Sequence, residues 1–292
     1  MPFDFGCEKS ETPKKVSLEK RSPQPNSNNI PLDIGSLKFG FDLRLGPKDD
    51  VKIYLPFLRY LEQYTGRRFS LRFTERYEDT VENLGKGITH LAALGPVNAI
   101  LAIERHGASC LAAGLNSEGK PEYRAVIFTK TNSQIKRLAD LRGKTFAFGD
   151  KFSTQGHIIP RKMIEDNGLT LKDFKSFTFT GSHANTAMAV LNGEYDAGGM
   201  QDALAKRLSE EGKIRIIAVS GPFPSSLICS NKDIDPVVVK SVKQALLSFS
   251  PRGKHSNTLV DWHKTEMPNG FADFSEVSLD EIRLLVKRYG IL

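Results

Sequence analysis

The chain has 292 residues, of which 39% are hydrophobic and 26% are charged, with a formal net charge of +7 at pH 7. A chain of this length can form two lobes with separate cores, because single hydrophobic cores stop growing at about 250 to 300 residues. No apolar run approaches the ~18 residues that a membrane-spanning helix needs. Lys and Arg are interspersed with Asp and Glu, so no basic stripe predicts nucleic-acid binding, whereas a modest positive charge favours a small anion.

The N-terminal segment differs in composition from the rest. Residues 1–33 are rich in Pro, Ser, Lys, Glu and Asn, and such a segment cannot bury enough apolar surface to offset the entropy lost on ordering. We therefore expect a disordered tether. One hypothesis is that Cys7, which follows Gly6, is acylated and anchors the chain to a membrane as in a lipoprotein. Asp4 and Phe5 suit such a site poorly, and no cationic stretch followed by an apolar one precedes the cysteine. The alternative is an extension without that role.

The remaining cysteines and the histidines give no sign of a metal or redox site. Cys110 and Cys229 lie in apolar segments without CxxC spacing, so we predict small core side chains and no disulfide framework or zinc site. The six histidines show no metal-ligand spacing, and no glycine-rich nucleotide loop follows a strand. We expect no metal, no cofactor and no catalytic residue.

Strand and helix patterns alternate from residue 37 onward. Apolar residues at three- and four-residue steps indicate helices, and alternating apolar residues indicate strands. The predicted strands span 37–44, 67–74, 89–95, 109–114, 123–130, 145–150, 174–181, 195–200 and 214–221. The predicted helices span 51–66, 77–87, 97–107, 157–168, 182–193, 201–212, 236–249 and 278–290. This alternation predicts an α/β fold with parallel or mixed sheets.

The C-terminal part breaks this pattern. Pro222 and Pro224 are unsuited to a central strand, so we interpret 221–230 as a crossover. The remainder of the chain after it is predicted to be mostly helical.

The turn after the strand at 145–150 is the first candidate site. Ser153 and Thr154 can cap the next helix, Gly156 lets the backbone approach a ligand, and Pro160 is expected to restart the helix. The start of a helix exposes unpaired N–H groups and a partial positive charge, which suit phosphate or a similar oxyanion. Ordinary helix capping is the alternative for this turn taken alone.

A second turn of this kind contains Gly181, Ser182 and His183. In an open α/β sheet, ligands bind at the carboxyl ends of strands, so two such turns in one lobe can face one cleft. His183 can donate to an oxyanion through a ring nitrogen, or it can be a capping or surface histidine. A hydrolase triad of Ser153, His183 and Asp150 is not supported, because the chain has no GxSxG turn.

Taken in order, these segments resemble the phosphate, phosphite and phosphonate substrate-binding proteins of ABC transporters, a branch of the type 2 periplasmic binding fold. The resemblance runs from about Leu37 to the last helices and rests on linked segments, among them "RYEDTVENLGKGITHLAALGP", "DLRGKTFAFGDKFSTQGHIIPRKM" and "GSHANTAMAVLNGEYDAGGM". It implies two lobes, each a mixed sheet flanked by helices, with two hinge crossings near 126–130 and 220–226. Lobe 1 would comprise residues 34–126 and 222–292, and lobe 2 residues 127–221.

The resemblance also implies a ligand site in the cleft between the lobes. The hydroxyls and N–H groups of the first turn would hold the oxyanion, His183 would donate from the second turn, and Tyr77 would reach across from lobe 1. The implied ligand-binding residues are Ser153, Thr154, Gln155, Gly156, Ser182, His183, Tyr77, Leu94 and Gly95.

Some positions depart from the family's pattern. Gln155 stands where the family often has a second serine, so an amide replaces one hydroxyl donor. Ala203 and Ser225 occupy places where aminophosphonate binders carry carboxylates, although Asp202 is adjacent and could take that role. Because a buried ammonium without a carboxylate partner is costly, phosphate, phosphite or a simple alkylphosphonate fits better than an aminoalkylphosphonate.

The implied role is that of an extracytoplasmic solute-binding protein, periplasmic or at the cell surface. It would close on the anion and deliver it to an ABC permease, with the chain expected to act as a monomer. Two alternatives stay open. A sensor protein of the same fold would bind the same ligand and signal to a membrane partner, and an enzyme is possible because fold does not fix function.

Overall fold

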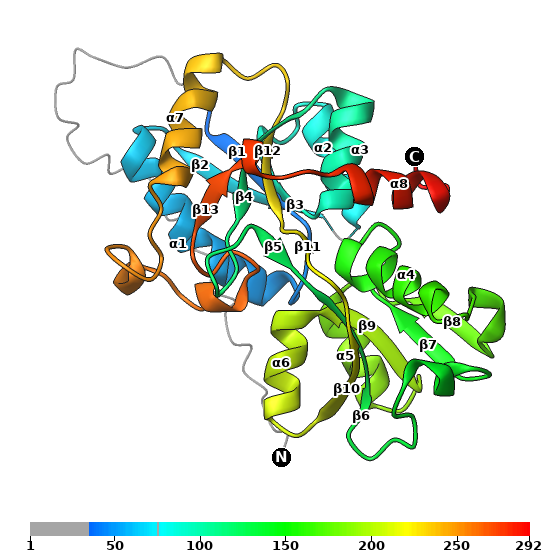
Figure 1. Ribbon diagram of the computed structural model, residues 1–292. Helices are drawn as coiled ribbons and strands as arrows, with labels where there is room; N and C mark the ends of the chain where they lie inside the picture. Colours follow the sequence, from blue (N-terminus) through cyan, green and yellow to red (C-terminus); the bar gives the residue numbers. More distant parts are fainter. Residues whose placement is uncertain (1–34, 75) are drawn as a thin grey trace, which may run out of the picture. The chain divides into compact units, whose positions relative to one another are not determined.

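The computed structural model of the chain describes residues 35–74 and 76–292. The predicted tether over 1–33 and the hypothesis on Cys7 lie outside these residues. Residues 36–292 form one compact unit that contains two larger sheets, which Figure 1 shows with helices packed around them. We call the part built on the six-stranded sheet lobe 1 and the part built on the five-stranded sheet lobe 2. None of the described helices has the length and apolar character needed to cross a membrane.

The lobe 1 sheet has the strand order β13-β4-β12-β3-β1-β2 and is mixed. β1 pairs in parallel with β2 and β3, whereas β12 is antiparallel to β3 and β4. Its strands are β1 (Leu37–Phe41), β2 (Phe69–Phe73), β3 (Leu91–Leu94), β4 (Ser109–Gly114), β12 (Leu227–Ser230) and β13 (Phe271–Asp273). Its helices are α1 (Pro47–Thr65), α2 (Tyr77–Gly85), α3 (Pro96–His106), α7 (Pro236–Leu247) and α8 (Asp280–Arg288).

Side chains of β3 show how this sheet separates two cores. Leu91 and Ala93 pack with α1 and α7, while Ala92 and Leu94 pack with α2, α3 and α8. Successive side chains of a strand point to opposite faces, so a strand with helices on both sides is apolar throughout. Helix α1 ends where predicted, since Gly66 takes a left-handed conformation with φ of 68° that favours glycine.

The lobe 2 sheet has the order β10-β6-β9-β7-β8. β7 pairs in parallel with β8 and β9, and β6 is antiparallel to β9 and β10. Helices α5 and α6 cover one face and α4 covers the other. The strands are β6 (Ala125–Lys130), β7 (Thr145–Phe148), β8 (Ser176–Phe179), β9 (Ala197–Gln201) and β10 (Ile214–Val219). The helices are α4 (Ile159–Asp166), α5 (His183–Leu191) and α6 (Asp202–Glu210).

The chain crosses between the two sheets twice. The first crossing runs from β5 (Glu122–Tyr123) into β6, just before the predicted 126–130, and the second runs from β10 into β11 (Phe223–Pro224). β5 and β11 pair in antiparallel fashion as a two-stranded ribbon, so the two crossings lie side by side. The two-lobed α/β architecture predicted from the sequence is confirmed.

The prediction for 221–230 was wrong in its second half. Residues 227–230 form β12, which lies between β3 and β4 in the middle of the lobe 1 sheet. Both prolines precede this strand and therefore remove none of its ladder hydrogen bonds. The prediction of a mostly helical remainder also missed β13, a three-residue edge strand.

The prediction for the two apolar cysteines was wrong as well. Cys110 of β4 and Cys229 of β12 are joined by a disulfide. They lie opposite each other in the antiparallel pairing of the two strands but are separated by 119 residues in the sequence. Sequence spacing does not reveal such a pair, because only the return of the chain from lobe 2 brings the second cysteine beside the first.

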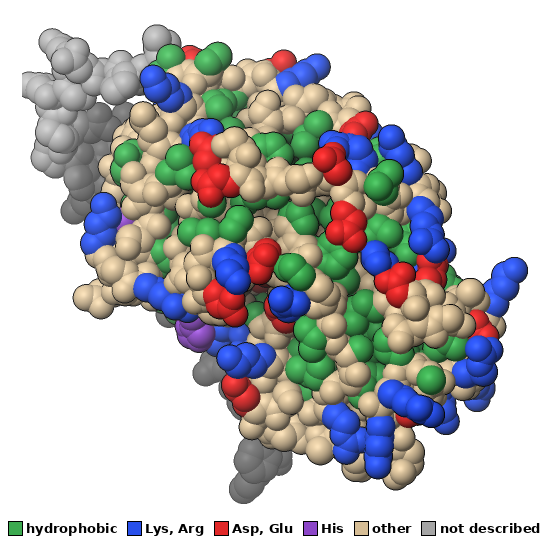
Figure 2. Space-filling model, in the orientation of Figure 1, with side chains coloured by type: hydrophobic (Ala, Val, Ile, Leu, Met, Phe, Trp, Pro, Cys, Tyr) green, Lys and Arg blue, Asp and Glu red, His purple; other side chains and the backbone are tan. Residues whose placement is uncertain are grey.

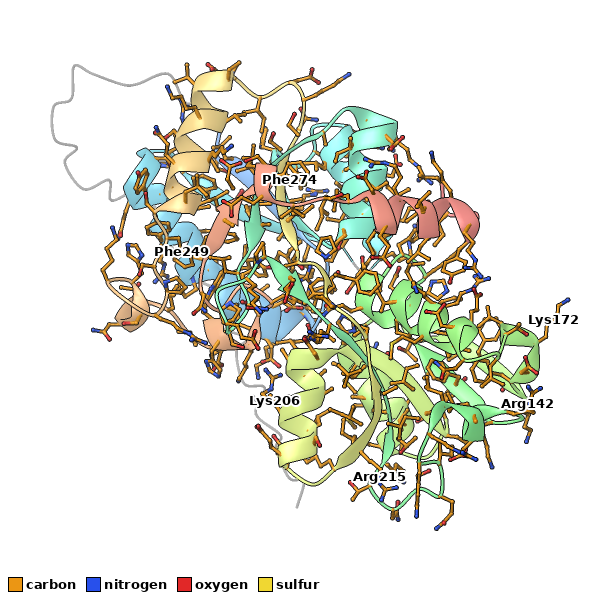
Figure 3. The ribbon with its side chains drawn as sticks, in the orientation of Figure 1. Arg142, Lys172, Lys206, Arg215, Phe249 and Phe274 are labelled. Carbon is orange, nitrogen blue, oxygen red and sulfur yellow. A yellow bond between two sulfur atoms is a disulfide. The ribbon has the colours of Figure 1, made fainter. Side chains whose placement is uncertain are left out.

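Charged side chains of both signs are scattered over one face of the molecule (Figure 2). Figure 2 shows Lys and Arg interspersed with Asp and Glu on the face drawn there. Arg142, Lys172 and Arg215 project outward at the far end of lobe 2, away from the sheet of lobe 1 (Figure 3).

Candidate functional site

The turn after β7 begins a helix and leaves two donors free. Ser153 caps a short π-helical turn, Thr154–Ile158, which leads into α4, and its Oγ accepts a hydrogen bond from the N–H of Gly156 at 2.9 Å. Among residues 35–74 and 76–292, the N–H groups of Thr154 and Gln155 have no acceptor. Unpaired N–H groups at the start of a helix can bind an anion.

Gly156 is required by packing inside this turn. The carbonyl of Gly156 accepts from the N–H of Gly149 at 2.9 Å. A Cβ added at Gly156 would lie 2.9 Å from Ser153 Oγ and 3.0 Å from Gly149 Cα. The backbone that approaches Gly156 here is therefore that of Gly149, and the N–H of Gly156 is already used by Ser153.

The second turn also caps a helix. Ser182 Oγ accepts from the N–H of Asn185 at 3.1 Å, so this hydroxyl serves α5. His183, the first residue of α5, is buried, and within the described part of the chain its Nδ1 has no hydrogen-bond partner. Burial and then the positive charge of Arg44 lower the pKa of His183 to about 3. The imidazole is therefore neutral at physiological pH and can donate one N–H.

Lobe 1 contacts the first turn directly. Thr154 Oγ1 accepts from the N–H of Val97 in the first turn of α3, at 3.0 Å. Leu94, at the end of β3, is fully buried, and Gly95 is the N-cap of α3. Tyr77, the first residue of α2, is buried, and its burial raises the pKa of the phenol well above its usual value. The hydroxyls of Ser153 and Thr154 each accept one hydrogen bond and can still donate their own proton to a ligand.

The Gln155 side chain is directed toward the first crossing. Its Nε2 donates to the carbonyl of Arg124 at 2.8 Å and lies 3.5 Å from Asp202 Oδ1. Asp202 in turn accepts from the N–H groups of Arg124 and Ala203. Both groups therefore hold the backbone of Arg124 at the first crossing, and the Asp202 carboxylate is already hydrogen-bonded by the backbone.

Several polar residues near the site were missed from the sequence. Asp42 and Arg44 directly follow β1, and polar residues at the carboxyl end of a buried strand were the available signal. Asp42 accepts from the N–H of Gly95 at 3.1 Å and from Asn98 Nδ2 at 2.9 Å. Burial raises the pKa of Asp42 to about 7, opposed by the charge of Arg44 and by these two hydrogen bonds.

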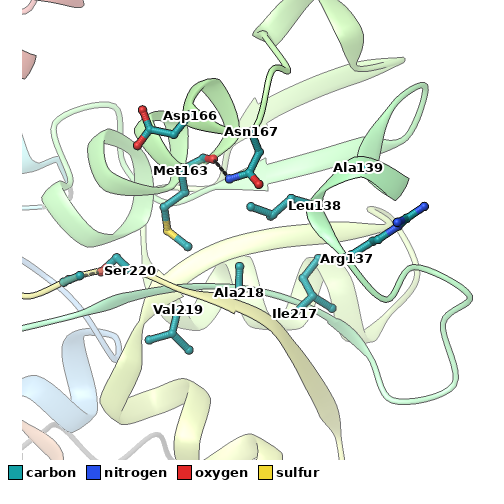
Figure 4. Close-up of a pocket in the computed structure, with 11 residues that line it drawn as sticks. Arg137, Leu138, Ala139, Met163, Asp166, Asn167, Ile217, Ala218, Val219 and Ser220 are labelled. Carbon is teal, nitrogen blue, oxygen red and sulfur yellow. Dashed lines mark hydrogen bonds between the residues drawn. The ribbon is translucent and has the colours of Figure 1, made fainter.

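Two hollows between described residues lie away from the turns at Ser153 and His183. An open hollow of about 620 Å³ is lined by Met163, Asn167, Leu138 and Ile217 among others, and no predicted site residue lines it (Figure 4). A second, of about 510 Å³, lies between α6 and loops of lobe 1 and reaches Tyr123, Asp202 and Glu266 beside the cleft. Neither is the anion site predicted from the sequence.

The family follows from the comparison with known sequences. The sequence model of the periplasmic substrate-binding proteins of phosphonate ABC transporters matches residues 39–279. The chain belongs to this family. Proteins of this family are described as substrate-binding components, and the resemblance inferred from the linked motifs is confirmed.

Three curated relatives illustrate the range within the family. The phosphonates-binding periplasmic protein of Escherichia coli is 28% identical over 148 residues, covering 49% of this chain and 44% of that protein. The phosphate-import protein PhnD of Mycolicibacterium smegmatis is 25% identical over 206 residues, covering 65% and 64%. A probable phosphite binding protein of Prochlorococcus marinus is 28% identical over 170 residues, covering 55% and 50%. The chain thus matches between 44% and 64% of the length of these relatives.

Solved structures agree on the fold. A Prochlorococcus marinus protein in complex with methylphosphonate matches with a TM-score of 0.79 at 17% identity, covering 88% of this chain and 99% of that chain. A binding protein of a Pseudomonas aeruginosa phosphonate transporter matches with a TM-score of 0.75 at 21% identity, covering 86% and 85%. The family member described here therefore has the two-lobed type 2 periplasmic binding fold.

Proposed function

We propose that this chain is an extracytoplasmic solute-binding protein that captures a phosphorus oxyanion in the cleft between its lobes. The observation that carries the proposal is the pair of helix starts in lobe 2. One presents the free N–H groups of Thr154 and Gln155, and the other presents the neutral imidazole of His183. Hydrogen bonds of this kind to a charged ligand contribute about 1.5 to 3 kcal/mol each.

The ligand that fits best is phosphate, phosphite or a simple alkylphosphonate. At the positions where aminophosphonate binders carry carboxylates, Ala203 and Ser225 have none, and the adjacent Asp202 carboxylate already accepts two backbone N–H groups. The relatives are named for phosphonates, phosphate and phosphite, and one structural neighbour holds methylphosphonate. These names support a phosphorus oxyanion as the class of ligand.

We further propose delivery to an ABC permease, which would recognise the closed lobes. The family description supports this partner. The Cys110–Cys229 disulfide supports an extracytoplasmic location, because disulfides persist in oxidising compartments. A lipid anchor at Cys7, a monomeric state and the absence of nucleic-acid binding remain part of the proposal.

The test is calorimetry on protein freed of bound ligand, with phosphate, phosphite and methylphosphonate as ligands and sulfate for comparison. At least one phosphorus oxyanion should bind and raise the melting temperature. Thr154→Ala should weaken that binding by roughly 1 to 3 kcal/mol, because it removes a hydroxyl donor. Thr170→Ala is the matched control, since Thr170 caps a short helix that contains none of the proposed ligand-binding residues. The proposal fails if no phosphorus oxyanion gives either heat or stabilisation.

A further inference from the structure

A buried ion pair joins Arg44, which follows β1, to Glu266. Arg44 Nη1 donates to Glu266 Oε2, and the two side chains are only 9% and 2% exposed. Arg44 follows the carboxyl end of β1, which is where ligands bind in sheets of this type. Its carbonyl accepts from the N–H of Ala184, the residue after His183, at 3.3 Å. Arg44 therefore lies against the start of α5, beside a predicted ligand-binding residue.

The surroundings of this pair contain polar atoms without partners. In the described part of the chain, Glu266 Oε1, both amide atoms of Gln201 and His183 Nδ1 are buried and make no hydrogen bond. A small cavity of about 10 Å³ is lined by Arg44, Gln201, Thr265 and Glu266 among others. That volume is close to the minimum for one water molecule. Buried polar groups are nearly always paired, so the unpaired atoms of Gln201 and Glu266 around this cavity indicate a water molecule there. His183 Nδ1 does not line the cavity and is left for a ligand.

Arg44 has donors left for such a ligand. Guanidinium carries five N–H donors, and residues 35–74 and 76–292 provide no acceptor for those on Nε and Nη2. The other proposed ligand contacts are neutral hydroxyl, amide and imidazole groups. A guanidinium can hold two oxygens of a phosphorus oxyanion in a bidentate manner, so Arg44 would add the one formal positive charge to the site.

We propose that Arg44 is a further ligand-binding residue, whose guanidinium donates to the bound oxyanion through the edge that Glu266 leaves free. Glu266 is its positioning residue, orienting the guanidinium and balancing its charge when the cleft is empty. This inference rests on the proposed function. It has a consequence that a purely structural ion pair lacks: the ligand and Glu266 compete for the same positive charge.

The test compares variants that remove one member of the pair at a time. Arg44→Gln should weaken methylphosphonate binding at least about tenfold, because the site loses its cation. Glu266→Gln should tighten binding, by about threefold or more, because the amide can still accept from Arg44 while the competing negative charge is gone. Both variants should lower the melting temperature without ligand, since each leaves one buried charge unpaired. The two variants are thus expected to change the affinity for methylphosphonate in opposite directions, whereas both should lower the stability of the fold.

The controls separate this inference from the proposed function. Lys52→Gln breaks an exposed pair with Asp261 and should change neither affinity nor stability appreciably. Arg44→Lys keeps the positive charge but loses the planar guanidinium that can bind two oxygens at once. It should bind methylphosphonate with an affinity between those of wild type and Arg44→Gln.

If wild type binds methylphosphonate but Arg44→Gln and Glu266→Gln shift its affinity in the same direction, or not at all, Arg44 does not contact the ligand. If wild type binds neither methylphosphonate nor the other oxyanions, the proposed function falls and this inference with it.

Discussion

Asp42 places a carboxyl group beside donors that we propose hold an anion. It accepts from Gly95 and Asn98, on the side of lobe 1 that faces Thr154. Burial raises the pKa of Asp42 to about 7, so the carboxyl is partly protonated near neutral pH. A bound anion would favour the protonated form further, and binding should therefore be accompanied by proton uptake.

The raised pKa has a consequence for stability. Between about pH 4 and pH 7 the folded chain holds a proton on Asp42 that the unfolded chain has lost, so stability from this group falls as pH rises. We predict that wild type loses stability across this range relative to Asp42→Asn, by up to about 1.4 kcal/mol per pH unit. Urea denaturation of both proteins at several pH values measures the difference.

The lowered pKa of His183 destabilises the fold as pH falls. Because this effect is the same in wild type and in Asp42→Asn, it cancels in the difference between them. Asp166→Asn, which removes an exposed carboxylate from α4, controls for the loss of a charge. A difference between wild type and Asp42→Asn that stays constant with pH would contradict the prediction.

At the residue scale the sequence predicts the caps but not the ion pair. Ser153 and Ser182 cap their helices as the turn chemistry indicates, because a cap depends on neighbours three residues away. Arg44 and Glu266 are separated by 222 residues. Neither residue lies in a sequence pattern that indicates an ion pair. Only the folding of both segments onto the lobe 1 sheet brings the two side chains together.

The turn from β7 into α4 is the element on which the proposed site depends most. Its shape relies on two glycines whose backbones lie in contact, with Gly149 donating to the carbonyl of Gly156. We predict that Gly156→Ala destabilises the fold by about 1 to 3 kcal/mol, because the added Cβ would lie 3.0 Å from Gly149 Cα. It should also weaken methylphosphonate binding at least about tenfold, since the free N–H groups would move.

Denaturation and calorimetry on Gly156→Ala check both effects. The matched control is Gly221→Ala, because a Cβ at Gly221 would meet nothing within 4 Å and its φ is not in the left-handed region. Wild-type affinity in Gly156→Ala would show that the geometry of the turn does not determine binding.

At the scale of elements the helices and most strands follow from their patterns, and the exceptions have a common cause. β12 has only four residues and follows two prolines, and β13 has three. Segments this short contain too few alternations to show a period of two. Their strand conformation comes from pairing with β4 and, for β12, with β3 as well.

At the scale of the whole chain, a cluster of polar side chains joins the lobes at the outer end of the cleft. Glu165 of α4 accepts from Tyr289 at 3.1 Å and pairs with Arg288 at 2.8 Å, both at the end of α8. Arg161 donates to the same carboxylate at 3.0 Å and stacks over the Tyr289 ring. Because α4 belongs to lobe 2 and α8 packs on lobe 1, this cluster links the two lobes in the arrangement seen in this structure.

We predict that Glu165→Gln favours the open state and weakens methylphosphonate binding about two- to fivefold, as expected for a partly exposed ion pair. Small-angle X-ray scattering should detect a larger radius of gyration without ligand. Lys162→Gln is the control, because its partner Asp166 lies on the same helix and the pair joins no second lobe. Equal radius and affinity in the two variants would mean that the cluster does not hold the lobes together.

The two-lobed architecture could be predicted from the alternation of elements and from the resemblance, whereas the disulfide could not. Its two cysteines look like small apolar residues in apolar strands, and the pairing depends on which strands become neighbours. Strand order is a property of the whole sheet, so no local window of sequence contains it.

The position of that disulfide determines how the chain would carry mechanical load. Tension applied between residues 36 and 292 reaches Cys110 in β4 and passes directly to Cys229 in β12, through a covalent bond. The segment between the two cysteines, which are 119 positions apart, contains the whole lobe 2 sheet and both crossings, and it would bear no tension. A force that unfolds lobe 1 would thus leave the two proposed anion-binding turns folded. About 400 Å of extended chain could be released only after the disulfide is reduced.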